Sequence, residues 1–132
     1  MMSVRRTIRV KAFQALFQLS NNYRSNSADA IKYALTYPLN KDGDDVSEIE
    51  AMKLILPVEN VTDKMASENL AYLTDLVVGV KENQGFIDEQ LEKQLKNWSL
   101  QRIEITNLLI WRLATYELYF HEEIDPSIVI NE

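Results

Sequence analysis

Four cationic side chains lie close together near the start of this chain, within the segment VRRTIRVKAF at residues 4–13. They are Arg5, Arg6, Arg9 and Lys11. The first carboxylate of the sequence comes only at Asp29. Guanidinium groups match phosphate oxygens with paired hydrogen bonds, and the amino end of a helix attracts anions. The cluster therefore predicts a site for a polyanion such as RNA, with a solvated run of charge as the alternative.

The energetics of helix termini argue against a purely structural role for this cluster. Cations near the amino end of a helix oppose its macrodipole, at a cost of about 0.3–1 kcal/mol each. Arg9 also follows Arg5 by four residues and Arg6 by three, so like charges repel on one side of the helix. The whole chain has 20 acidic and 14 basic residues, whereas residues 1–28 contain no acid. This asymmetry also indicates a polyanion site at one end of the protein.

Other polar groups do not form a recognisable catalytic or metal site. The segment DGDD at residues 42–45 lacks the spacing of an EF-hand loop and is expected to be a solvated loop. His121 is the single histidine, and its position favours interaction with a helix carboxyl end over metal binding. There is no cysteine, nucleophile–base pair or glycine-rich phosphate loop. We therefore predict a protein that is not an enzyme and needs no metal or cofactor.

Several aromatic residues are candidates for either core packing or base stacking. Trp111 and Tyr116 occur at helical spacing in an apolar segment, so we expect both in the core. Trp98, Tyr72 and Phe17 could stack on nucleic-acid bases, although core positions are more common for such residues.

Composition indicates one all-α domain. The 132 residues include 46 % hydrophobic residues but only three glycines and three prolines, and apolar residues recur with a period of 3.6. Helices are expected at about residues 3–22, 27–36, 47–56, 62–83, 86–98 and 100–122, and another beginning at Asp125-Pro126. Ser3 is the expected N-cap of the first helix. The helix at 100–122 is apolar on nearly all sides, which predicts a central buried helix. Neither a secretory signal nor a membrane span is evident, so we expect a soluble cytoplasmic protein.

Three segments resemble the NusB family of bacterial transcription antitermination factors. They are VRRTIRVKAFQALFQLS (4–20), AYLTDLVVGV (71–80) and RIEITNLLIWRLATYELYFHEEIDPSIVINE (102–132). The resemblance implies one NusB-like helical domain with two small helical subdomains, at about residues 1–83 and 84–132. It also implies binding of boxA-type leader RNA together with the ribosomal protein NusE, within an antitermination complex on RNA polymerase.

The resemblance assigns roles to individual residues. Arg5, Arg6 and Arg9 correspond to RNA-contacting arginines of the family, and Lys11 is added as a further RNA-binding residue on charge alone. Phe17, Arg112 and Glu117 are the candidate partner-binding residues. Phe17 stands where the family often has tyrosine, so a hydroxyl contact is lost. Arg112 and Glu117 have structural roles as alternatives, since an arginine in an apolar helix can pair with a nearby carboxylate.

The chain also departs from the family pattern. Residues 36–62 are longer than the usual linker, and the last helix stops at Asn131-Glu132 where the family continues. We therefore expect an incomplete C-terminal subdomain with one uncovered face of the 100–122 helix, and hence a marginal monomer or a homodimer. Two other functions remain open: an accessory RNA-binding domain of an rRNA methyltransferase, and a protein-interaction scaffold without an RNA role.

Overall fold

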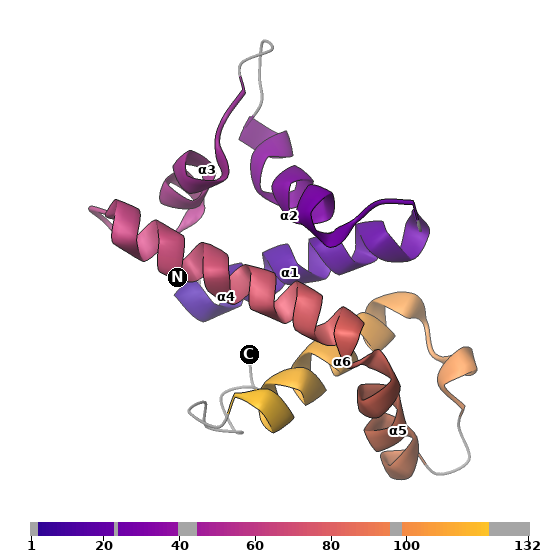
Figure 1. Ribbon diagram of the computed structural model, residues 1–132. Helices are drawn as coiled ribbons and strands as arrows, with labels where there is room; N and C mark the ends of the chain where they lie inside the picture. Colours follow the sequence, from indigo (N-terminus) through magenta and orange to yellow (C-terminus); the bar gives the residue numbers. More distant parts are fainter. Residues whose placement is uncertain (1–2, 23, 40–44, 96–98, 122–132) are drawn as a thin grey trace. The chain divides into compact units, whose positions relative to one another are not determined.

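The computed structural model describes residues 3–22, 24–39, 45–95 and 99–121 (Figure 1). Within these ranges the chain forms six α-helices, two short 3₁₀ helices and no strand, which confirms the all-α prediction. The chain divides into two compact units, Met1–Val77 and Val78–Glu132. In the described residues, no helix is both long enough and apolar enough to span a membrane.

The first unit contains the elements that carry the cationic cluster. They are α1 (Val4–Asn21), α2 (Ser27–Thr36), the 3₁₀ helix η1 (Tyr37–Leu39), α3 (Glu48–Ile55) and most of α4 (Asp63–Glu82). Each of these four α-helices begins where a side chain accepts a hydrogen bond from a first-turn N–H group. These caps are Ser3 Oγ to Arg6 N (3.0 Å), Asn26 Oδ1 to Asp29 N (2.8 Å), Ser47 Oγ to Glu50 N (3.1 Å) and Thr62 Oγ1 to Met65 N (3.1 Å). The expected cap at Ser3 is therefore confirmed.

The packing of α1 against α2 forms a large part of the core of the first unit (Figure 1). The buried apolar residues of α1 are Ile8, Ala12, Ala15, Leu16 and Leu19, and those of α2 are Ala30, Ile31, Ala34 and Leu35. Their spacing of three and four residues puts each set on one side of its helix. Alanines contribute to both sets, and small side chains allow two helix backbones to approach closely. This packing fixes which side of α1 is buried. Arg5 and Arg6 do not lie on that side and are exposed.

The second unit contains the end of α4, α5 (Gln84–Gln94), the 3₁₀ helix η2 (Leu100–Arg102) and α6 (Ile105–Phe120). The expected helix over 100–122 was wrong at its start, because η2 comes first, Ile103 is extended and Glu104 is not helical. Leu100 and Ile103, three residues apart, fit a 3₁₀ turn as well as an α-helix, so periodicity did not separate the two. The helix expected at 86–98 begins earlier, at Gln84, and ends at Gln94.

The burial of α6 also differs from expectation. Tyr116 is buried, but Trp111 is 40 % exposed and is therefore not a core residue. Other exposed apolar residues of α6 are Ile105, Ile110, Leu118, Tyr119 and Phe120. An all-round apolar composition predicts burial only where neighbouring elements cover every side, and a sequence pattern does not reveal those neighbours. Trp98, the end of the chain with the expected helix at Asp125, and most of the DGDD loop lie outside the described residues.

Gly79 allows close packing between α4 and α6 within the second unit. A Cβ atom added at Gly79 would overlap the ring of Tyr116, which is itself buried. By contrast, a Cβ atom at Gly85, in the first turn of α5, would meet nothing within 4 Å.

We therefore predict that Gly79→Ala lowers the free energy of unfolding by about 1–3 kcal/mol, because overpacking outweighs the gain in helix propensity. The matched change Gly85→Ala should raise it by about 0.4–1 kcal/mol, because it only reduces the freedom of the unfolded chain. Urea denaturation followed by circular dichroism measures both. An unchanged free energy of unfolding in Gly79→Ala would contradict the close approach of Gly79 to Tyr116.

Candidate nucleic-acid interface on α1

The first turns of α1 present the arginine cluster. Arg5 and Arg6 are exposed, and Arg9 is half-buried one turn further along. The first turn contains no acidic residue. The amino end of the helix thus combines the positive end of the helix dipole with guanidinium groups, and both favour an anion.

Arg5 is held by an aromatic ring of α4. Its guanidinium carbon lies 4.4 Å from the ring centroid of Tyr72, which is a cation–π distance. Such stacking uses the flat face of the guanidinium and leaves the N–H groups at its edge available for a phosphate. The sequence left Tyr72 open between base stacking and core packing. In the structure it is half-buried and orients Arg5. The contact reduces the side-chain freedom that Arg5 would lose on binding.

Lys11 occupies a different environment from the arginines. Its Nζ donates a hydrogen bond of 3.0 Å to the carbonyl oxygen of Ala34 in α2. Burial lowers the pKa of Lys11 from its ordinary value of 10.5, because desolvation disfavours the charged form. This lysine therefore links α1 to α2, whereas Arg6 is exposed. On charge alone, Lys11 was predicted to act with the arginines. A sequence does not reveal that its partner is a backbone carbonyl 23 residues away.

An aromatic groove lies between α1 and the α2–η1 segment. Its volume is about 390 Å³, within the range of small-ligand pockets, roughly 300–1,000 Å³. It is lined by Phe13, Gln14, Phe17, Gln18, Tyr33, Ala34, Tyr37 and Pro38. Phe13 and Phe17 stack with ring centroids 6.1 Å apart, and Tyr33 and Tyr37 stack at 4.6 Å.

Sequence reasoning singled out only Phe17 among these groove residues. The available signal was the spacing of four residues in both aromatic pairs, which puts each pair on one side of its own helix. That spacing did not show that the two pairs line the same groove.

The candidate partner-binding residues are not gathered at one place. Phe17 is half-buried in the groove of the first unit. In the second unit, Arg112 Nε and a terminal guanidinium nitrogen donate to the two carboxylate oxygens of Asp88, each at 2.9 Å. Glu117 is only 1 % exposed, so a partner would not reach it in this conformation. For Arg112 and Glu117 the structural alternative is thus the better supported.

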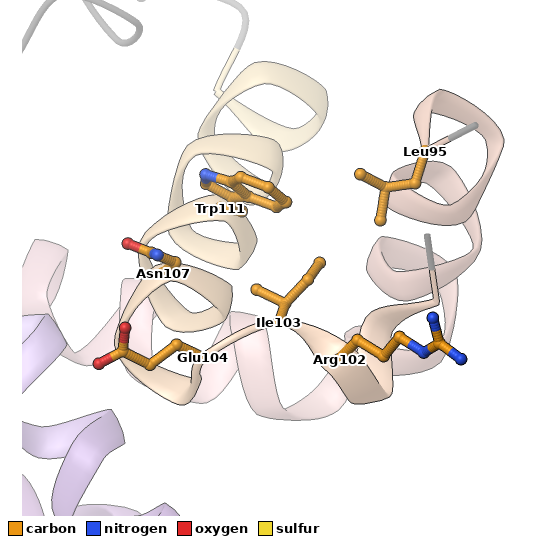
Figure 2. A pocket seen from close by; sticks show the side chains of 6 residues that line it. All are labelled: Leu95, Arg102, Ile103, Glu104, Asn107 and Trp111. Atoms are coloured by element: carbon orange, nitrogen blue, oxygen red, sulfur yellow. The ribbon is translucent and has the colours of Figure 1, made fainter. Parts of the chain in front are cut away.

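A second pocket lies in the second unit and has a volume of about 380 Å³. Figure 2 shows Trp111 and Leu95 facing each other across it, with Ile103 between them. Arg102, Glu104 and Asn107 line the rest, and the figure shows no converging set of polar groups. Among the described residues there is also no group of three or more histidine or acidic side chains that could hold a metal ion. Neither pocket therefore presents a catalytic arrangement.

Comparison with known proteins defines the class of this helical protein. The sequence model of the NusB family matches residues 6–132. The chain is 35 % identical over 128 residues to proteins named transcription antitermination protein NusB from Bacillus cereus (strain ATCC 10987 / NRS 248) and Bacillus thuringiensis (strain Al Hakam). The alignments cover 97 % of this chain and 77 % of each relative. No solved structure matches. The chain belongs to the NusB family, which confirms the resemblance noted in its sequence.

We predict that Lys11→Met changes how stability depends on pH. Below pH 10.5 the unfolded chain holds more protons at Lys11 than the folded chain, so the free energy of unfolding rises with pH between the lowered pKa and 10.5. Lys11→Met should remove this rise, so its free energy of unfolding should depend less on pH as the pH approaches 10.5 from below. Urea denaturation at a series of pH values measures the difference. Parallel curves for the two proteins would show that Lys11 is not desolvated.

We predict that Asp88→Ala lowers the free energy of unfolding by about 1.5–3 kcal/mol, because it removes two charge-assisted hydrogen bonds and strands a poorly exposed guanidinium. The Asp88 and Arg112 side chains are only 23 % and 13 % exposed. Glu89→Ala is the matched control, since Glu89 pairs at 3.7 Å with Lys93 at an exposed position and should cost less than about 0.5 kcal/mol. Equal costs for the two variants would show that the Arg112 pair is not structural.

Proposed function

We propose that this protein is an RNA-binding transcription antitermination factor. It binds boxA-type leader RNA together with the ribosomal protein NusE, and the pair joins the antitermination complex on RNA polymerase. The relatives' name, transcription antitermination protein NusB, supports the process. The observation that supports RNA as the ligand is the acid-free first turn of α1, in which exposed arginines lie at the positive end of the helix dipole.

The three arginines have different tasks in this proposal. Arg6, exposed on the first turn, contacts a phosphate directly. Arg5 does so from a position fixed by the Tyr72 ring. Arg9 extends the cationic track by one turn along α1. Lys11 supports the site by joining α1 to α2 and contributes little to phosphate binding.

The overall charge of the protein fits selective RNA binding. The formal net charge is −6, so most of the surface repels a polyanion while α1 attracts it. RNA is then drawn to one end of the first unit. The acidic remainder suits a basic protein partner, which is consistent with NusE as the second component.

The test is a fluorescence anisotropy titration of a boxA-type RNA, with and without NusE, at several salt concentrations. Each phosphate contact with a single strand contributes about 0.7 to the slope of log K against log salt concentration. We predict that Arg5→Ala/Arg6→Ala/Arg9→Ala lowers this slope by about two units and weakens binding.

A charge-matched control removes three exposed cations outside α1 and should leave the slope nearly unchanged. Its substitutions are Lys64→Ala, Lys81→Ala and Lys93→Ala. If both triple variants lower the slope equally, general charge and not the α1 site accounts for binding. If the wild-type protein does not bind RNA even with NusE, the interaction scaffold is the better account.

A further inference from the structure

We infer that the aromatic groove between α1 and the α2–η1 segment holds a base of the single-stranded RNA whose phosphates lie on the arginines. This inference rests on the proposed function and adds a second subsite to it. The groove is lined by two stacked aromatic pairs from different elements of the first unit. Nothing in the arginine cluster itself accounts for this groove.

The groove continues the cationic face of α1. Arg6, Arg9 and Phe13 follow one another at three and four residues, and Phe17 comes four residues later. Residues with this spacing lie along one side of a helix, each about one turn above the last. Arg9 and Phe13 are therefore about 6 Å apart along the helix axis, at 1.5 Å per residue. One nucleotide can span such a distance between its phosphate and its base.

The side chains that line the groove suit a base in both shape and chemistry. Tyr33 and Tyr37 are 49 % and 62 % exposed, so their rings offer free surface for stacking. Stacking tolerates any base, because every base has a π face. Gln14 and Gln18 line the same groove, and their amides can donate to or accept from the edge of a base.

Charge favours RNA over an apolar peptide as the occupant. None of the residues that line the groove is acidic, and the cations nearest to it in sequence are Lys32 and Lys11. Lys11 also donates to the carbonyl oxygen of Ala34, which itself lines the groove. A peptide could cover the tyrosine rings, but it would leave the arginines on the same face without a role. A single strand accounts for both features through one continuous contact.

The experiment uses single-stranded boxA-type RNAs in each of which one base is replaced by 2-aminopurine, a fluorescent base that is quenched by stacking. With the wild-type chain, we expect quenching at one position of the RNA. Tyr33→Ala/Tyr37→Ala should abolish this quenching and weaken binding roughly 5- to 100-fold, while the salt slope stays unchanged. Tyr33→Phe/Tyr37→Phe keeps both rings and should retain the quenching, which separates stacking from loss of structure.

Tyr119→Ala is the matched control, because Tyr119 is a 51 % exposed aromatic residue of the second unit. It should leave both quenching and affinity at wild-type values. Arginine-dependent binding without quenching at any position would overturn the groove while leaving the proposed function intact. Absence of salt-dependent RNA binding by the wild-type chain would overturn both. Loss of NusE binding in Tyr33→Ala/Tyr37→Ala, with the quenching intact, would assign the groove to a protein and also overturn the inference.

Discussion

The close packing of α1 against α2 is the constraint on which the proposed RNA site depends. It fixes which side of α1 is buried, through small residues such as Ala12 and Ala15 on one helix and Ala30 and Ala34 on the other. Because side chains of a helix have fixed angular positions, burial of this side also determines where the arginines point. A rotation of α1 would bury cations that have no acidic neighbour in sequence, at a large desolvation cost. Packing and electrostatics therefore select the same orientation.

This packing also explains why the cations of α1 behave differently. Lys11 lies close enough to α2 to donate to the carbonyl oxygen of Ala34, and partial burial lowers its pKa. Arg5 and Arg6 lie beyond that contact, on turns exposed to solvent. The groove between α1 and the α2–η1 segment has the same origin, since Phe13 and Tyr33 line it from the two packed elements. The phosphate and base subsites that we propose thus belong to one packing arrangement.

Local signals in the sequence predicted much of this fold. Ser3 and the regular apolar spacing correctly indicated α1, and the helix expected at 27–36 matches α2. Such features depend on residues within one turn of each other, so a sequence reveals them directly. The break before α6 was not predicted, because Ile103 and Glu104 leave the helical conformation in a segment without glycine or proline. There the tertiary structure determines the backbone, and local propensity does not.

The site itself was only partly predictable for the same reason. The arginines are adjacent in sequence, so their cluster was visible at once. The Tyr72 ring beneath Arg5, the Asp88 partner of Arg112 and the burial of Glu117 all depend on elements that are distant in sequence. Family resemblance suggested roles for Arg112 and Glu117. However, only the structure shows that one is paired within the chain and the other is enclosed.

The most direct measurement of the central claim is a two-dimensional ¹⁵N NMR titration of the labelled protein with boxA-type RNA, recorded for backbone amides and arginine side-chain Nε–H groups. The account predicts the largest shifts at the Nε–H groups of Arg5, Arg6 and Arg9 and at the backbone amides of the first turns of α1. The amides of α5 should remain nearly unchanged. Shifts concentrated in α5 and α6, with the α1 arginines unmoved, would contradict it and place the RNA site on the second unit.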